Sequence, residues 1–315
     1  MLLRPLKGDR SRDDHAALFR RVTIMVLELV NQIIQGALIG GLYVLFAIGL
    51  SLSLGVMRFV NIAHGDLIVL ASFILMSFSA ILGLSPFIAA ALLMPAAFLA
   101  FYALQRLLLQ RLVGTNLLGV ILVTFGLAIV IQNGLLQTYG PDTRKLSGGA
   151  LELKSISIGG GLSIGLYPLL VFATAVVVIF ALDRFLYRTS IGSRIRAVAD
   201  DPAAANLIGL PSAKIYGIAM GVVGLTVMSA ACCMSVWTNF DPEIGPSRLL
   251  IAFEVVVLGG LGSLWGTLVG GIIIGVAQNL GAQVDAAWQI LAQHLVFLVI
   301  LFLRPQGLFS RGSRT

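Results

Sequence analysis

The sequence predicts an all-α integral membrane protein with about nine transmembrane helices. Of its 315 residues, 58% are hydrophobic and 11% are charged, a balance typical of helices in lipid and not of a water-exposed domain. A soluble protein with a large core would need charges between its apolar runs, yet residues 62–105 contain a single charged residue, Asp66. Apolar runs of about 20 residues, the length that crosses a bilayer core, recur along the chain.

Nine apolar runs are the candidate spans, and they form one predicted domain over residues 25–310. The run at 249–264 is short and ends in a glycine-dense turn, so it could equally belong to a broken or re-entrant helix. The count therefore ranges from eight to ten. The runs cover residues 36–57, 62–82, 86–109, 117–139, 162–186, 215–237, 249–264, 266–284 and 287–303.

The positions of Lys and Arg predict the orientation. If the loop at 183–214 is cytoplasmic, alternation of the spans puts eleven of these cations inside and four outside, the excess that cytoplasmic loops carry. The four outside are Arg144, Lys145, Lys154 and Arg248. This bias accounts for the net charge of +7, so no nucleic-acid partner is predicted. The stretch at 140–161 becomes an external loop.

The N-terminal residues 1–24 conflict with this orientation. They hold six Lys/Arg against three Asp and should stay cytoplasmic, while nine spans with a cytoplasmic C-terminus start outside. One resolution takes Met25 as the true start, with residues 26–35 as a short interfacial helix on the outer surface. The other is a tenth crossing at about 22–38. We favour the first; the tail lacks the cleavage site of a signal peptide.

No motif indicates chemistry by this chain itself. The phosphate loop, H-E-x-x-H and G-x-S-x-G patterns are missing from the sequence, and its three histidines are scattered. Cys232 and Cys233 are adjacent in an apolar run and suit neither a disulfide framework nor a metal site. We expect a chain that is not an enzyme and binds no metal or cofactor, so that any ATP it needs is hydrolysed by a partner.

The stretch NIAHGD places four polar or small candidate residues at the cytoplasmic start of the second span. They are Asn61, His64, Gly65 and Asp66. One interpretation is a helix start, with Asn61 as N-cap and Asp66 in the first turn. The other is a locally irregular backbone that lines an aqueous translocation path. The two do not exclude one another.

A second candidate stretch is rich in glycine. Small residues spaced four apart let two membrane helices approach closely, so we expect helix packing, with a mobile gate at the turn as the alternative. The residues are Gly259, Gly260, Gly262, Gly266 and Gly270.

Glu254 lies just before this stretch, inside an apolar run. A carboxylate within the membrane is by default a functional-site candidate. It could line the translocation cavity and meet an amino group, or it could be neutralised by a proton or a partner subunit.

Residues 201–214, DPAAANLIGLPSAK, have the pattern of a short helix of a soluble protein, although the chain around them is strongly hydrophobic. Asp201 suits an N-cap, Pro202 the first helical position and Gly209 the end of the helix. So short a helix is marginal alone, so a cytoplasmic partner is expected to hold it. Upstream, Arg194 and Arg196 could meet lipid phosphates or acids on that partner.

Three stretches, taken in order, carry a resemblance to a known family. They are VNIAHGD, in which Ile62 follows Asn61 where the family pattern has the reverse order, YRTSIGSRIRAVADDPAAANLIGL and LGGLGSLWGTLVGGIIIG. Together the sequence resembles the membrane permeases of branched-chain amino acid ABC importers, the LivH-like family, from about residue 36 to residue 309.

The resemblance implies an ABC importer permease fold in the bacterial inner membrane. It also implies a second homologous permease subunit, two cytoplasmic ATPase subunits that use the ATP, and a periplasmic substrate-binding protein. Residues 201–210, within a cytoplasmic coupling segment at 188–214, match the helix that docks on the ATPase. The implied coupling residues are Arg194, Arg196, Asp201, Pro202, Ala203, Ala204, Leu207 and Gly209.

Two departures keep the substrate open. The basic tail has no expected counterpart, and Glu254 stands where the family suggests a small or apolar residue. The substrate is therefore a branched-chain or other small amino acid, or alternatively urea, a short amide or a small organic acid. A rival of another class is an ion-coupled secondary carrier that uses Glu254, Asp66 and His294 as a proton relay.

Overall fold

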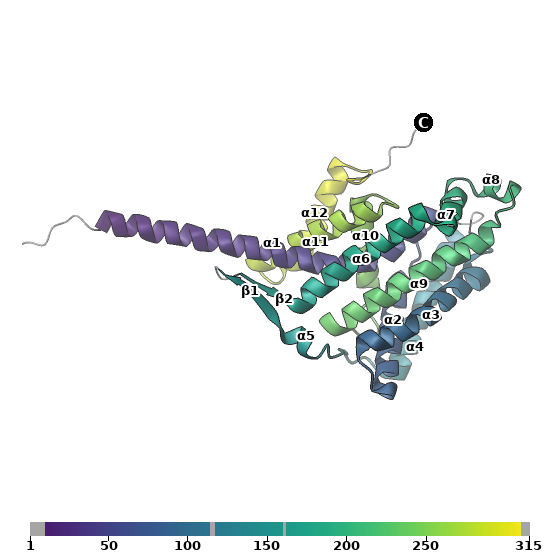
Figure 1. Ribbon diagram of the computed structural model, residues 1–315, viewed down its shortest axis with the longest axis horizontal. Helices are drawn as coiled ribbons and strands as arrows, with labels where there is room; N and C mark the ends of the chain where they lie inside the picture. The colour runs from purple at the N-terminus through teal and green to yellow at the C-terminus, as the bar shows by residue number, and fades with distance from the viewer. Residues whose placement is uncertain (1–9, 114–116, 160–161, 310–315) are drawn as a thin grey trace, which may run out of the picture.

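The computed structural model describes residues 10–113, 117–159 and 162–309 and is built almost entirely of helices (Figure 1). The elements are α1 (Arg10–Met57), α2 (His64–Leu82), α3 (Pro86–Ala103) with a π-helical extension (Leu104–Leu109), α4 (Leu117–Tyr139), α5 (Ala150–Leu153), β1 (Ser155–Gly159), β2 (Leu162–Gly165), α6 (Leu166–Arg188), α7 (Ser190–Asp200), α8 (Pro202–Leu207), α9 (Ser212–Trp237), α10 (Gly245–Gly259), α11 (Leu264–Val284) and α12 (Trp288–Leu303).

The predicted class, an all-α membrane protein, is confirmed. Within the described residues, seven helices are long and apolar enough to cross a membrane, and α12 is apolar but shorter. Each of the nine predicted runs falls on its own helix, but α10 has 15 residues and spans about 22 Å at 1.5 Å per residue. The number of complete crossings stays a prediction.

Helix α1 corrects the expectation for the N-terminal region. The predicted interfacial helix at 26–35 and the alternative tenth crossing are both wrong as separate elements, because one uninterrupted helix runs from Arg10 to Met57. No Pro or Gly lies between Arg10 and Gly36, so nothing stops the helix there. Its N-terminal part projects from the body of the molecule (Figure 1). The tail's first nine residues lie outside the described ranges, and Met25 as the start stays a prediction.

Helix α1 packs along α11 through facing glycines. A Cβ at Gly40 would lie 2.5 Å from the carbonyl oxygen of Gly271, and one at Gly36 would lie 2.9 Å from that of Gly275. Only glycine permits so close an approach of two backbones. The pair buries the centre of α1, where residues such as Val44 and Phe46 are fully enclosed.

Helices α2 and α10 both begin inside the bundle and not at its edge. After Met57 the chain turns back along α1, so that the His64 ring lies 2.9 Å from the carbonyl oxygen of Phe46, eleven residues and about 16 Å before the end of α1. There α2 crosses the start of α10: a Cβ at Gly65 would lie 2.0 Å from the carbonyl oxygen of Gly245.

The span predicted at 249–264 is therefore corrected. The helix starts at Gly245 and ends at Gly259, because Pro246 suits the first turn and Gly260 adopts φ +99° after the end. The helix is not among the seven candidate spans, and both interpretations left open for this run, a short span or a broken or re-entrant helix, stay predictions. Arg248, predicted on the outer side before this span, lies within the first turn of α10, and its side of the membrane stays a prediction.

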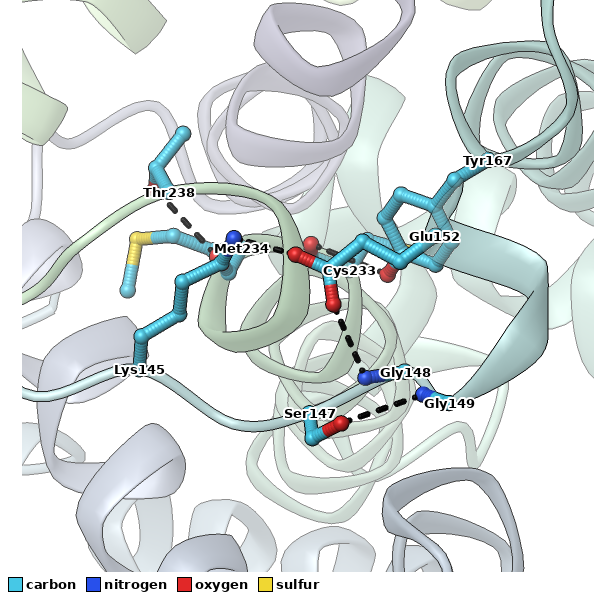
Figure 2. Close-up of polar contacts among 9 residues, drawn as sticks. All are labelled: Lys145, Ser147, Gly148, Gly149, Glu152, Tyr167, Cys233, Met234 and Thr238. Carbon is cyan, nitrogen blue, oxygen red and sulfur yellow. Dashed lines mark hydrogen bonds and ion pairs between the residues drawn. The ribbon is translucent and has the colours of Figure 1, made fainter. Parts of the chain in front are cut away.

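The loop predicted to be external folds over the end of α9 opposite α7 and α8 (Figure 1). It contains α5 and an antiparallel hairpin of β1 and β2, and the Leu146 amide donates to the Ser235 carbonyl at 2.7 Å. Figure 2 shows the ion pair of Lys145 with Glu152, whose other carboxylate oxygen accepts from the Gly148 amide at 3.2 Å.

Candidate functional site

Helix α8 is held by caps at both ends, as its sequence predicts. The Asp201 carboxylate accepts hydrogen bonds from the amides of Ala203 and Ala204 at 2.9 and 3.0 Å. Pro202 is the first helical residue. At the other end Gly209 has φ +83°, and its amide donates to the Asn206 carbonyl while the Leu210 amide donates to that of Ala205, the pattern of a Schellman motif.

The outer face of α8 is apolar and uncovered. Leu207 is 89% exposed and Ile208 is 75% exposed, while Ala205 on the opposite face is buried. Ala203 and Ala204 are exposed as well. Exposed apolar side chains gathered at the tip of a connecting segment indicate a protein contact.

The coupling segment contains a second helix, α7, that the sequence analysis missed. Thr189 caps it, since its hydroxyl accepts from the Gly192 amide at 3.0 Å, and Ile195 and Val198 are buried. The signal was present in the apolar spacing of residues 191, 195 and 198, which follows one helical face. The segment is therefore two capped helices in series.

Arg58 joins α7 to the end of α1. Its guanidinium donates to the carbonyl oxygens of Ala199 at 3.0 Å and Asp200 at 3.5 Å, where a cation satisfies the C-terminal end of α7. Arg58 adopts φ +57°, an uncommon conformation for a residue other than glycine. Arg58 therefore links the end of α7 to the turn between α1 and α2.

The two predicted coupling arginines differ in position. Arg194 is exposed on α7, available to a partner or to lipid phosphates. Arg196 is half-buried, and its guanidinium lies 4.5 Å from the centre of the Tyr187 ring.

Four of the predicted pathway residues are enclosed by protein. Asn61, His64 and Asp66 are each at most 2% exposed, and Gly65 is pressed against Gly245. Asn61 is not the N-cap of α2, because the N-cap is Ala63. The side-chain oxygen of Asn61 accepts from the Ala63 amide at 3.1 Å and so closes the turn that precedes the helix. That detail of the prediction is wrong.

Asp66 does lie in the first turn of α2, as predicted. Its carboxylate accepts from the Gln132 side chain at 2.9 Å and lies against the first residue of α10, because a Cβ at Gly245 would be 2.0 Å from it. One carboxylate therefore faces two helix N-termini, both of which carry partial positive charge.

Glu254 finds a partner within its own chain. It is 2% exposed, and one carboxylate oxygen pairs with His294 Nδ1 on α12. The other oxygen has no hydrogen-bond partner among the described residues. Its predicted pathway role stays a prediction, while the geometry connects α10 to α12.

The glycine-rich stretch lies at close helix contacts. A Cβ at Gly259 would be 2.4 Å from the Gly266 carbonyl oxygen, and one at Gly270 would be 2.5 Å from that of Val255. Gly262, with φ +78°, touches Gly55 of α1. Gly260 ends α10. A gating role for the turn stays a prediction.

The exposed face of α10 went unnoticed in the sequence. Ser247, Leu250 and Phe253 are exposed along one side, and the Arg248 guanidinium lies 5.6 Å from the centre of the Phe46 ring. Because α10 begins well inside the bundle, a polar group there has to meet water or protein and not lipid.

The family profile for "Branched-chain amino acid transport system / permease component" matches residues 32–303. The chain belongs to this family. It is 29% identical to the "high-affinity branched-chain amino acid transport system permease protein BraD" of Pseudomonas aeruginosa, over 91% of this chain and 97% of that protein. It is 24% identical to LivH of Salmonella typhimurium, over 90% of this chain and 96% of that protein. The ribose import permease RbsC of Haemophilus influenzae is 32% identical over 45% of this chain and 46% of its own length.

Family membership confirms the resemblance stated from the three motifs. This permease component is a multi-pass protein of the bacterial inner membrane. Permeases of ABC systems work with ATPases and binding proteins, so the rival interpretation as an ion-coupled carrier is set aside. Of the three residues of that proposed relay, the structure pairs Glu254 with His294, while Asp66 bonds to Gln132.

Proposed function

We propose that this chain is the permease subunit of an ABC importer that carries branched-chain amino acids into the cell. A second homologous permease and two cytoplasmic ATPases would complete the membrane complex, and a periplasmic protein would deliver the substrate. The names of BraD and LivH, which match nearly the whole chain, support this substrate class.

The observation that carries the coupling role is the uncovered apolar tip of α8. Leu207 and Ile208 project from a helix whose ends are fixed by its own caps. A rigid helix presenting an apolar face is what a groove on a partner protein accepts. Through α7 and Arg58, a push on α8 reaches the turn before α2.

The exposed face of α10 is the proposed lining of the translocation path. It offers Ser247 at a depth where lipid would reject a polar group, and Leu250 and Phe253 follow toward the C-terminal end of α10. The second permease subunit would supply the facing wall.

Co-purification tests the coupling role. The ATPases of the complex should bind this chain, and Leu207→Asp should abolish their capture because a charge would be buried in the groove. Leu153→Asp is the matched control, since Leu153 is 90% exposed at the other end of the molecule. Equal capture by both variants would contradict the assignment of α8.

Uptake tests the substrate. Proteoliposomes that hold the full complex, with ATP inside and the binding protein outside, should accumulate radioactive leucine. Vesicles that hold this chain alone under a proton gradient should not. Accumulation of urea or acetamide in place of leucine would replace the proposed substrate but keep the importer.

A further inference from the structure

A cavity of about 420 Å³ lies beside the coupling segment. Its walls come from the last turns of α1 and α6, from α7 and from the start of α11. Its volume is within the range of pockets that hold small molecules. It is distinct from the exposed face of α10 that we assign to the translocation path.

Two opposite charges on α7 line this cavity without neutralising one another. Arg196 and Asp200 are four residues apart, so they share one helical face. Among the ion pairs within 4.0 Å that the described residues form, none joins Arg196 to Asp200. The Arg196 guanidinium rests on the Tyr187 ring instead, and its Nε has no hydrogen-bond partner in the described part of the chain.

A buried hydroxyl and apolar side chains complete the lining. Ser51 is fully buried, and its Oγ has no partner within the described ranges, which is costly for a polar group away from water. Leu52, Val56 and Ile195 give the same cavity apolar walls. A cation, an anion and an aliphatic wall therefore line one space.

We propose that this cavity binds a free α-amino acid with an aliphatic side chain. The ligand's carboxylate would accept from Arg196, its ammonium would donate to Asp200, and its side chain would pack on Leu52 and Val56. The proposal rests on the proposed function, which makes such amino acids the transported substrate. It adds a site at the end of the bundle where the substrate leaves.

Occupancy would restrain the coupling segment. One wall of the cavity is α7 and the opposite wall is α1, and Arg58 already joins the same two elements. A zwitterion held by Arg196 and Asp200 of α7, with its side chain on Leu52 and Val56 of α1, adds a second connection, so the bound state holds α7 in this position.

Calorimetry on the assembled permease–ATPase complex, without the binding protein, tests the site. Leucine should bind. Leucinamide lacks the carboxylate and 4-methylpentanoate lacks the ammonium, so each should bind about tenfold or more weakly, because each loses one charge-assisted contact. No heat from leucine, or equal affinity for the three compounds, would overturn the proposal.

Variants assign the binding to this chain and not to the second permease. Arg196→Gln and Asp200→Asn should each weaken leucine binding about tenfold or more. Arg184→Gln is the matched control, because Arg184 also lies over an aromatic ring, that of Phe180, but does not line the cavity. Size-exclusion profiles show whether each complex is intact, and Arg196→Lys, which keeps the charge, should retain part of the affinity.

Leucine uptake by the same preparations separates this proposal from the proposed function. Uptake by a complex that does not bind leucine in calorimetry overturns the cavity site and leaves the importer standing. A complex without leucine uptake overturns the proposed substrate, whatever the calorimetry shows.

Discussion

Helix α8 and the crossing pair α2 and α10 stabilise their helix ends in opposite ways. Helix α8 uses neighbours in sequence: Asp201 at its start, and Gly209 with its reversed φ at its end. Helices α2 and α10 have no side-chain cap of their own. They rely on each other, with Asp66 between them and two glycines in contact.

This difference follows from the surroundings of the helix ends. Helix α8 is exposed and has to be stable through local bonds before a partner covers it. The crossing of α2 and α10 is enclosed, so tertiary packing can replace the caps, at the cost of tolerating almost no change in volume. The variants below separate the two cases, in order of decreasing effect on stability.

Gly65→Ala should give the largest loss of stability. Its methyl group would meet the Gly245 carbonyl oxygen at 2.0 Å, and backbone cannot yield as a side chain can, so we expect at least about 3 kcal/mol. Thermal unfolding of the purified complex measures it. Gly134→Ala is the control: nothing lies within 4 Å of a Cβ there, so a small gain of helix stability is expected. Equal melting temperatures would refute the close crossing.

Asp66→Ala should cost about 1–3 kcal/mol, because it leaves the Gln132 amide without its acceptor in a buried place. Asp66→Asn retains an acceptor and removes only the charge that faces two helix N-termini, so its loss should be smaller, about 0.5–2 kcal/mol. Urea or thermal unfolding of both variants ranks them. A smaller loss for Asp66→Ala than for Asp66→Asn would contradict the hydrogen bond to Gln132, because both variants remove the charge.

Asp201→Ala should cost about 1 kcal/mol of local helix stability with almost no change in the global melting temperature. Hydrogen exchange of residues 202–207 should become faster, and leucine uptake should fall, because a frayed α8 transmits less movement. Asp201→Asn should retain both properties, since Asn is an equivalent cap. A drop in global stability would mean that α8 is part of the core.

Glu152 predicts a small pH effect in the external loop. The pKa of Glu152 is lowered from its ordinary 4.5 by its hydrogen bond with Lys145 and by the Gly148 amide. A carboxyl group whose pKa is lowered in the folded state stabilises the fold at pH values above its ordinary pKa. This stabilisation is lost as the pH falls through the lowered pKa. Wild type should therefore exceed Glu152→Gln in melting temperature at pH 7, and the gap should close in acid. A difference in melting temperature that does not change with pH would contradict the ion pair of Glu152 with Lys145.

What could be predicted from the sequence follows the same division. Asp201, Pro202 and Gly209 act on the residues next to them, so the ends of α8 were predictable. The contact of Gly65 with Gly245, and with it the place where α10 begins, depends on segments far apart in the sequence. Residue spacing carries no information about such encounters.

The candidate site shows the same limit. Sequence reasoning grouped Glu254 with Asp66 and His294 as a possible relay, but it could not tell which of the two pairs with Glu254, because all three lie on different helices. It assigned Arg196 to a partner protein, whereas the fold turns its guanidinium onto Tyr187. Side-chain identity predicts the kind of partner, and only the fold selects which one.

The pairing of α1 with α11 has a consequence for how the protein is made. Gln32 and Asn279 are hydrogen-bonded, yet 247 positions separate them in the chain. At about 5–20 residues per second, roughly 12 to 50 seconds of translation pass between them. During that interval α1 is already in the insertion machinery while its glycine face has no neighbour from its own chain. The last helices to leave the ribosome therefore close the structure around the first.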